Sequence, residues 1–326
     1  MDKQEHTIAR ATLQIRGIVP IVPTPFKTNQ EIDWESLHAL INFACASGAY
    51  ALCLPAYASE FYKLSEDERR QIIAEAVGQA SGRVPVIAQV NAYSAKQAEE
   101  TALDAQRAGV EAVSVSVPRL FPLAERDIFR YFDQILNAIN IPMVIQDFNP
   151  GGPTVSLEFI ANLHRTHPHF RYIKLEEPLM ASKVEAIVQK TSGEVGVLEG
   201  WGGMYMLELI PAGICGVMPS LGAADILASV FRLAEQGQKD EAYEIFQAVL
   251  PQIVFSLQNI ELLHHVEKSL LVARGIIYEA VVRDASLELN IHDRRYIFFL
   301  NNKILEMLDQ LDLPRNPAAA SSAARL

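Results

Sequence analysis

The residue best suited to covalent chemistry is a lysine that interrupts an apolar run. Lys174 lies within YIKL at residues 172–175, whereas the other nine lysines occupy predicted helix faces, loops or termini. Burial among apolar neighbours disfavours the charged ammonium, so a neutral amine becomes accessible. Such an amine attacks a carbonyl carbon and forms a Schiff base. The alternative is a lysine that reaches solvent from a strand end or pairs with a structural carboxylate.

Glu176 follows Lys174 by two positions, and this spacing places both side chains on one face of a strand. A carboxylate beside the lysine would hold its proton balance or move a proton on a bound substrate. The simpler alternative is that Glu176 only neutralises Lys174. We therefore predict that Lys174 and Glu176 are the catalytic pair and that Glu177 turns away from them.

Several other residues fall where predicted strands end, and these are the candidates for substrate binding. The turn of Tyr57, Ala58 and Ser59 offers amides and a hydroxyl to a substrate carboxylate. Asn91 and Gln146 would hydrogen-bond substrate hydroxyls. The alternative in each case is that the polar groups satisfy the backbone of a turn or loop. The remaining polar residues at strand ends are Thr24, Gln89, Arg119 and Asp147.

The glycine-rich GWGG at 200–203 lacks the spacing of a phosphate-binding loop. It predicts that the backbone at Gly200 approaches a ligand or turns tightly. Other polar residues are assigned to structural, packing or surface roles, and no metal site is predicted. These residues are Glu60, the HRTHPH segment at 164–169, His264, His265 and Glu267.

The elements that must position these residues are short apolar strands, each followed by a helical pattern. Near-continuous apolar strands separated by helices indicate a parallel sheet buried on both faces, and eight such units close into a (β/α)8 barrel. A doubly wound open sheet is the alternative, but no glycine-rich nucleotide turn follows the first strand. The predicted strands are 18–22, 51–55, 84–89, 112–117, 142–146, 172–175, 195–198 and 216–218.

The strand pattern stops near residue 225, and residues 226–312 are almost wholly helical in pattern. In a parallel barrel the active site lies at the carboxyl ends of the strands, where the candidate residues fall. The sequence therefore predicts an α/β protein, a TIM barrel with a C-terminal helical layer. The predicted divisions are an arm at 1–14, the barrel at 15–228, the helical region at 229–313 and a disordered tail at 314–326.

Composition excludes several classes of function. The 326 residues carry 28 Lys plus Arg against 39 Asp plus Glu, a formal charge of −11 that argues against a nucleic-acid partner. Three cysteines without CxxC spacing indicate reduced thiols, and the polar amino terminus lacks the pattern of a secretory signal. No apolar stretch is long enough for a membrane span. We expect a cytoplasmic protein with a small-molecule partner.

Four motifs carry a resemblance to a known family. TPF at 24–26, SEFYKLSEDER at 59–69, YIKLEEP at 172–178 and the segment that ends in GVMPS at 216–220 resemble the dihydrodipicolinate synthase/N-acetylneuraminate lyase family. The resemblance implies a (β/α)8 barrel, a Schiff base between Lys174 and a 2-keto acid, and a homo-oligomer, either a dimer or a tetramer. It implies no metal or organic cofactor, and it adds Met218 to the substrate-binding residues.

The sequence departs from that family at the positions that usually move protons. The GTTGE-like turn is replaced by AYASE at 56–60, and the tyrosine of the YNxP motif by Gln146. Arg119 and Leu120 stand where a tyrosine pair is usual. GGPT at 151–154 lacks the arginine that holds the second substrate of dihydrodipicolinate synthases. The resemblance therefore argues against lysine biosynthesis as the activity.

One branch of the family fits better. LCLPAYASEF, VIQDFNPGGPTVS and the Lys-x-Glu of IKLEEP resemble 2-keto-3-deoxy-L-arabonate dehydratases, in which a glutamate two positions after the lysine is implicated in proton transfer. The predicted function is a Schiff-base lyase that dehydrates a 2-keto-3-deoxy sugar acid. The alternatives are a pyruvate-dependent aldolase, through retro-aldol cleavage or condensation, and a non-catalytic barrel that binds a keto acid.

Overall fold

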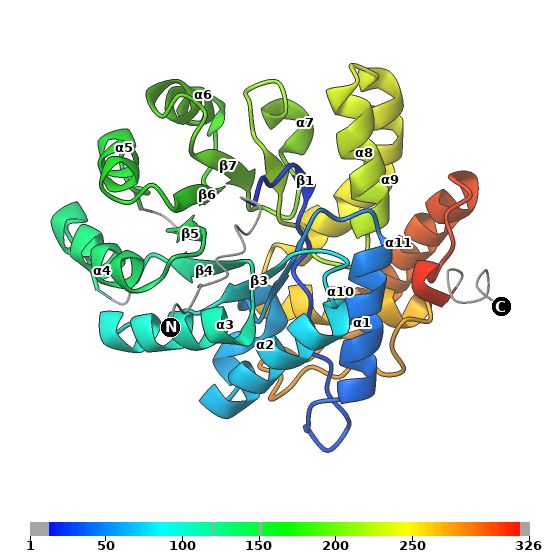
Figure 1. Cartoon of the computed structure of the whole chain (residues 1–326). Helices are drawn as coiled ribbons and strands as arrows, with labels where there is room; N and C mark the ends of the chain where they lie inside the picture. The colour runs from blue at the N-terminus through cyan, green and yellow to red at the C-terminus, as the bar shows by residue number, and fades with distance from the viewer. Residues whose placement is uncertain (1–12, 120, 150–151, 320–326) are drawn as a thin grey trace, which may run out of the picture.

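The computed structural model describes residues 13–119, 121–149 and 152–319, and the predicted (β/α)8 barrel is confirmed (Figure 1). All paired strands run parallel, in the order β1-β8-β7-β6-β5-β4-β3-β2. The strands are β1 (Gly17–Ile18), β2 (Leu52–Leu54), β3 (Val86–Gln89), β4 (Ala112–Ser116), β5 (Met143–Phe148), β6 (Phe170–Glu176), β7 (Gly196–Glu199) and β8 (Gly216–Val217).

The segment after β1 closes the ring. Ile21 bridges to Cys53 on one side and to Ser220 on the other. The amide of Val22 donates to the carbonyl of Cys53 (3.0 Å), and the amide of Cys53 donates to the carbonyl of Pro20 (3.0 Å). The strands therefore form a closed barrel without a free edge.

Helices and two 3-10 turns alternate with the strands and surround them (Figure 1). Several begin at side-chain caps, such as the capping box of Ser65 and Glu68 that starts α2. The elements are α1 (Trp34–Ala46), η1 (Tyr57–Ser59), η2 (Phe61–Lys63), α2 (Glu66–Ala80), α3 (Ala95–Ala108), α4 (Glu125–Ala138), α5 (Leu157–Thr166), α6 (Ala181–Lys190), α7 (Met206–Leu209), α8 (Ala224–Glu235), α9 (Lys239–Ser256), α10 (Ile260–Ala273) and α11 (Ile291–Gln310).

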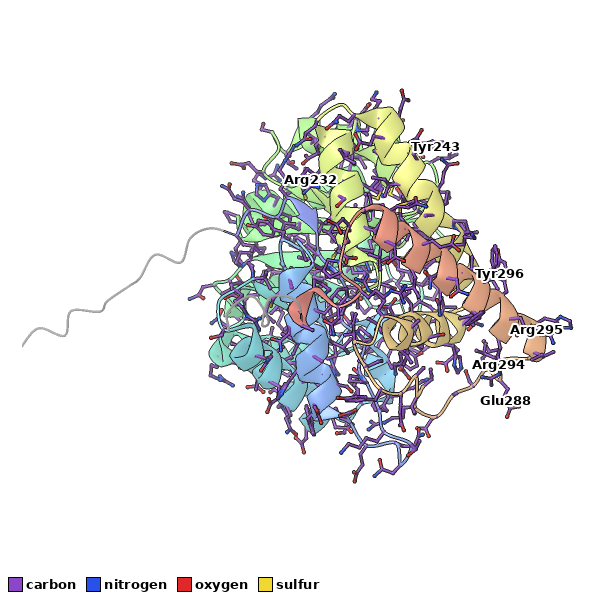
Figure 2. The ribbon with its side chains drawn as sticks, turned by 90° about the vertical axis from the view of Figure 1, so that its right-hand side faces the viewer. Arg232, Tyr243, Glu288, Arg294, Arg295 and Tyr296 are labelled. Carbon is purple, nitrogen blue, oxygen red and sulfur yellow. The ribbon has the colours of Figure 1, made fainter. Side chains whose placement is uncertain are left out.

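Helices α9, α10 and α11 form the predicted C-terminal layer. The predicted boundary at residue 228 falls inside α8, which packs on β1 as the eighth helix of the barrel and ends at Glu235. Figure 2 shows α9 and α11 on the outside of the molecule, where Tyr243 and Tyr296 point outward. Their exposed fractions are 57% and 42%. None of the described helices is both long and apolar enough to cross a lipid bilayer.

Two regions differ from the predicted pattern. Residues 275–290 are irregular, not helical, because Gly275 adopts a left-handed backbone (φ 69°) and Val281 pairs with Phe26 instead. Part of the predicted disordered tail packs against α10, where Arg274 donates to the carbonyl of Arg315 (2.8 Å). The rest of the predicted tail, 320–326, and most of the predicted arm, 1–12, lie outside the described residues.

The barrel interior is layered by the two-residue period of the strands. The alternate inward positions of β6 are Tyr172, Lys174 and Glu176, and Lys174 is in register with Gln146 and Leu198 on the neighbouring strands. Tyr172 closes the amino-end side of the barrel, where its hydroxyl donates to the carbonyl of Leu13 (2.7 Å). The interior is therefore apolar toward the amino ends of the strands and polar at their carboxyl ends.

Candidate active site

A cavity of about 850 Å³ opens at the carboxyl ends of the strands, where the active site of a parallel barrel is expected. Its lining comes from the strand ends, the turns that follow them, and the start of α10. Among the predicted residues, those that line it are Tyr57, Ala58, Asn91, Gln146, Lys174, Glu176, Gly200 and Met218.

The predicted catalytic pair lies together in this cavity. Lys174 is 7% exposed, and its Nζ lies 2.7 Å from Oε1 of Glu176. The amide of Gln146 donates to the same oxygen of Glu176 (3.0 Å). Among the described residues, Oε2 of Glu176 has no hydrogen-bond partner. One carboxylate oxygen is thus fixed by two donors, and the other remains free for a substrate.

Gln146 links this pair to a polar chain along the strand ends. Its amide oxygen accepts hydrogen bonds from Gln89 and from the hydroxyl of Ser116 (3.0 Å for Ser116). Its nitrogen donates to Glu176 and retains one N–H, so the predicted contact with a substrate hydroxyl stays a prediction. Sequence reasoning missed the positioning role, because the contacts join residues from β3, β4, β5 and β6.

Asn91 keeps an unused donor at the cavity. Its side-chain oxygen accepts from the amide of Ser116 (2.8 Å), whereas its Nδ2 is buried without a partner among the described residues. A buried donor without a partner costs free energy, which a ligand acceptor would recover. This arrangement fits the predicted contact with a substrate oxygen.

The turn after β2 presents Tyr57 and Ala58 to the cavity but turns Ser59 away from it. Ser59 is fully buried, and its hydroxyl donates to the carbonyl of Val22 (2.5 Å). Thr24 in turn donates to the carbonyl of Ser59 (2.7 Å). The assignment of the Ser59 hydroxyl to a substrate carboxylate is therefore wrong, because the 3-10 turn directs this side chain into the wall of the barrel.

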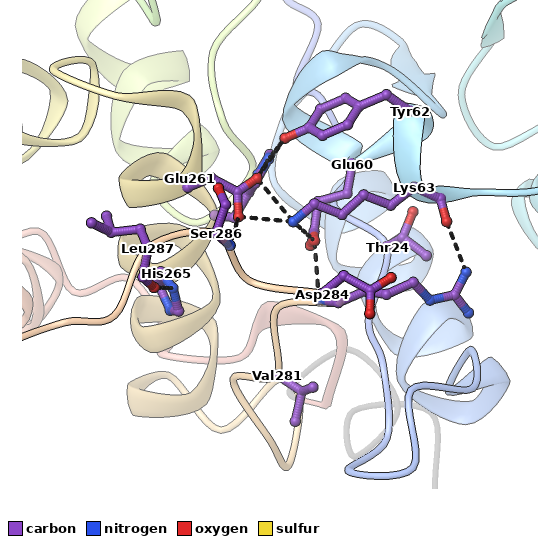
Figure 3. Close-up of polar contacts among 12 residues, drawn as sticks. Thr24, Glu60, Tyr62, Lys63, Glu261, His265, Val281, Asp284, Ser286 and Leu287 are labelled. Carbon is purple, nitrogen blue, oxygen red and sulfur yellow. Dashed lines mark hydrogen bonds and ion pairs between the residues drawn. The ribbon is translucent and has the colours of Figure 1, made fainter.

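Glu60 anchors the same turn to the C-terminal layer, in keeping with its predicted structural role (Figure 3). Its side chain is fully buried and forms ion pairs with Lys268 and with Lys63 (3.1 Å for Lys63). Burial lowers the pKa of Lys268 to about 8, although Glu60 acts in the opposite direction. Lys174 is thus not the sole buried lysine, and sequence reasoning missed Lys268 because it lies on an ordinary helical pattern.

A second carboxylate in this cluster, Glu261, connects η2 to α10 (Figure 3). Burial works to raise its pKa, but hydrogen bonds from Lys63, Tyr62 and Ser286 lower it to about 2. The hydroxyl of Tyr62 also contacts His264 (2.9 Å), whose pKa burial and two nearby lysines lower to about 3. The cluster is therefore a fixed support behind the cavity wall.

Gly200 is required by the close approach of the Lys174 and Glu176 side chains. A Cβ at this position would lie 2.4 Å from Cγ of Glu176 and 2.8 Å from Cε of Lys174. The close approach at Gly200 is to side chains of the protein, and the predicted approach to a ligand stays a prediction. The turn is held by Glu199, which accepts from the amide of Gly203 (2.7 Å), and burial raises the pKa of Glu199 to about 7. The sequence pattern gave no sign of this carboxyl group.

We expect Gly200→Ala to lower kcat on the order of 10²-fold. The added methyl group would push the Lys174 and Glu176 side chains out of the positions in which they contact each other. The matched control is Gly78→Ala, since a Cβ at Gly78 meets no atom within 4 Å. Steady-state kinetics on both variants, with circular dichroism to verify folding, makes the comparison. Wild-type kcat in Gly200→Ala would contradict the steric assignment.

An ion pair lies at the rim of the cavity. Arg119 lines the cavity and pairs with the fully buried carboxylate of Asp147, whose other oxygen accepts from the amide of Val155 (2.6 Å). Asp147 thereby neutralises this cation and fixes the segment after β5. Leu120, the second residue at the position of the family's tyrosine pair, lies outside the described residues.

The histidine-rich segment lies outside the cavity, as predicted. His164 contacts Glu194 (2.9 Å), and His167 contacts Asp133 (2.8 Å).

Glu267 is buried in packing contacts and accepts from the amide of Gly222 (2.7 Å). Within the described part of the chain, no group of three or more His, Cys, Asp or Glu side chains is placed to hold a metal ion.

A closed parallel barrel with a lysine–glutamate pair at its carboxyl-end mouth defines a (β/α)8-barrel protein with an enzyme-like cleft. Residues 14–295 match the dihydrodipicolinate synthetase family. The chain belongs to this family of aldolases and lyases, and the predicted family is confirmed.

Two curated relatives illustrate the range of activities. L-2-keto-3-deoxyarabonate dehydratase of Azospirillum brasilense is 30% identical over 247 residues, which cover 74% of this chain and 80% of that protein. A 4-hydroxy-tetrahydrodipicolinate synthase of Parabacteroides distasonis is 24% identical over 306 residues, which cover 93% and 99%.

Solved structures support the fold. Dihydrodipicolinate synthase of Rhodopseudomonas palustris superposes with a TM-score of 0.83 at 24% identity, over 90% of this chain and 99% of that one. A prophage member of the family from E. coli K12, crystallised with pyruvate, gives 0.80 at 20% identity over 89% and 98%.

Proposed function

We propose that this protein is a Schiff-base lyase that dehydrates a 2-keto-3-deoxy sugar acid. The observation that carries the proposal is the buried pair of Lys174 and Glu176, in contact at 2.7 Å at the base of the cavity. The likeness to L-2-keto-3-deoxyarabonate dehydratase supports this reaction over the others in the family.

The proposed reaction begins with transfer of the Lys174 ammonium proton to Glu176. The neutral amine attacks C2 of the keto acid, and loss of water gives a protonated imine. Glu176, after release of its proton, removes a proton from C3 through its free oxygen, and the C–H electrons form a C2=C3 enamine. The enamine electrons then form C3=C4 as the C4–O bond breaks, and hydroxide leaves as water after it receives a proton. Where C5 carries a hydroxyl, loss of a C5 proton and of the hydroxyl proton, with protonation at C3 and C4, converts this alkene into a semialdehyde. The imine is hydrolysed to free Lys174.

The substrate contacts follow from the donors around the cavity. Backbone amides of the Tyr57–Ala58 turn are proposed to hold the carboxylate, and Asn91 and Gln146 to contact hydroxyls. Gly200 and Met218 line the same space. The chemistry of this pair requires neither a metal nor an organic cofactor, because the protonated imine is itself the electron sink.

The activity test is a turnover screen over 2-keto-3-deoxy acids of different length and stereochemistry. Formation of a semialdehyde without release of pyruvate would support dehydration. Release of pyruvate would instead identify a retro-aldol enzyme, which uses the same imine. An imine trapped by borohydride without turnover of any sugar acid would favour a non-catalytic keto-acid-binding barrel.

We expect negligible condensation of pyruvate with aspartate semialdehyde. The segment after β5 has no arginine for the second substrate, and Arg119 at the rim is already neutralised by Asp147. Gln146 replaces the tyrosine that the family uses to relay protons. A coupled assay with a known dihydrodipicolinate synthase as positive control measures this activity, and robust condensation would refute our interpretation of these departures.

We further propose a cytoplasmic homo-oligomer, either a dimer or a tetramer. All three cysteines are free, as in a reducing compartment. Helix α11 exposes Tyr296, Phe298 and Phe299 by 42%, 68% and 51%, and such aromatic patches commonly mark interfaces. Light scattering of the purified protein tests the assembly, and a monomer at micromolar concentration would contradict it.

A further inference from the structure

The proposed dehydration requires an acid at the C4 oxygen as well as a base at C3. Departure of the C4 hydroxyl as water needs a proton at that oxygen, while Glu176 is occupied with the C3 proton. The amide of Gln146, at the usual position of a tyrosine, cannot act as an acid of this kind. Glu176 could return the C3 proton only where its carboxyl group also reaches the C4 oxygen, whereas an ionisable group on the facing wall would protonate this oxygen directly.

The side chains that line the cavity leave few candidates. Arg119 is paired with Asp147, and the hydroxyl of Tyr62 is held by Glu261 (2.7 Å). Tyr93 lies on the rim with 68% of its surface exposed. Tyr57 lines the cavity with its ring partly buried, together with Lys174 and Glu176.

The placement of Tyr57 suits a partner that acts from the opposite side of the substrate. It follows β2, and β2 lies across the eight-stranded barrel from β6, which carries Lys174. Its ring packs edge-on against Phe61 at 4.9 Å, and the guanidinium of Arg69 lies 5.3 Å from the Phe61 ring. A substrate attached to Lys174 would thus have Glu176 on its own side and the Tyr57 phenol on the facing wall.

The surroundings of the Tyr57 ring keep its phenol in the protonated state. Burial raises the pKa of Tyr57, and the nearby Tyr93 and Glu176 raise it further. The neighbouring Ser116 acts in the opposite direction. The phenol therefore stays protonated, which is the state an acid requires before transfer.

We propose that Tyr57 is the general acid that protonates the departing C4 hydroxyl, a role that rests on the proposed dehydration. The Tyr57 O–H bond breaks as the C4–O bond breaks, water leaves, and a phenolate remains. Glu176 holds the proton taken from C3, and exchange with solvent releases this proton and returns one to the phenolate. Protons and electron pairs thus balance without any oxidant or reductant.

The test separates proton movement at C3 from departure of the C4 group. Tyr57→Phe keeps the ring packing and removes only the hydroxyl, and Tyr93→Phe removes another phenol from the same cavity as the control. Borohydride trapping with pyruvate measures imine formation. Exchange of the pyruvate methyl protons in D₂O, followed by NMR, measures proton movement at C3. Dehydration of a 2-keto-3-deoxy acid and chloride release from 4-chloro-2-oxopentanoate measure the leaving step.

Tyr57→Phe should lose about 10²–10⁴-fold in kcat for dehydration, the usual contribution of an acid–base group. It should retain imine formation, methyl exchange and chloride release, because chloride departs without a proton. Glu176→Gln should lose exchange and chloride release together. Equal losses of dehydration and chloride release in Tyr57→Phe, or unchanged dehydration, would overturn the proposal. If the wild type forms no imine, the proposed function fails first and the role of Tyr57 falls with it.

Discussion

Lys174→Ala is expected to abolish both turnover and the borohydride-trapped adduct, since no other group replaces the amine that attacks the keto carbon. The folded barrel should persist, because Glu176 keeps its hydrogen bond from Gln146 and lines the open cavity. Mass spectrometry of the reduced protein and circular dichroism provide the two measurements.

Lys183→Ala is the matched control for this variant. Lys183 lies on α6 and pairs with Glu177 (3.2 Å), but it does not line the cavity. It should retain wild-type turnover and the full adduct. An undiminished adduct in Lys174→Ala would remove Lys174 from the reaction.

Glu176→Gln is expected to lower kcat by about 10²–10⁴-fold at every pH while the imine still forms. An amide keeps the size of the side chain and its contact with Gln146, but it cannot accept a proton from C3. If Glu176 only balances the charge of Lys174, the change should instead shift the pH at which the imine forms. The measurement is a pH–rate profile beside borohydride trapping.

The neighbouring Glu177→Gln provides the control. Glu177 turns away from the cavity toward Lys183 and Thr154, so its amide should leave the profile unchanged. Full recovery of kcat at a shifted optimum in Glu176→Gln would reduce Glu176 to a charge partner of Lys174.

The fold and the contact between Lys174 and Glu176 were accessible from the sequence because each rests on a local pattern. Short apolar runs between helical segments predicted the eight strands, which appear with ends shifted by a few residues. Lys174 stood out because polar residues rarely interrupt a buried strand. The two-residue strand period then placed Glu176 beside it, and the contact at 2.7 Å agrees.

The remaining parts of the site depend on contacts between distant segments. In the 3-10 turn at Tyr57–Ser59, the Ser59 side chain points into the wall of the barrel and Tyr57 lines the cavity. The residue types in the turn do not by themselves determine these orientations. Likewise, Lys268 pairs with Glu60 although 208 positions separate them in the chain. Residues 275–290 are helical in sequence pattern but irregular in the structure. Val281 in this segment pairs with Phe26, a contact that the local sequence does not reveal.

The central claim is that Lys174 forms an imine with a 2-keto acid, and peptide mapping of the reduced adduct tests it most directly. The wild-type protein is incubated with pyruvate, reduced with borohydride, digested and sequenced by mass spectrometry. We predict a single added 1-carboxyethyl group on the peptide that contains Lys174. An adduct on another lysine, such as Lys268, or no adduct under conditions that label a known family member, would contradict the account.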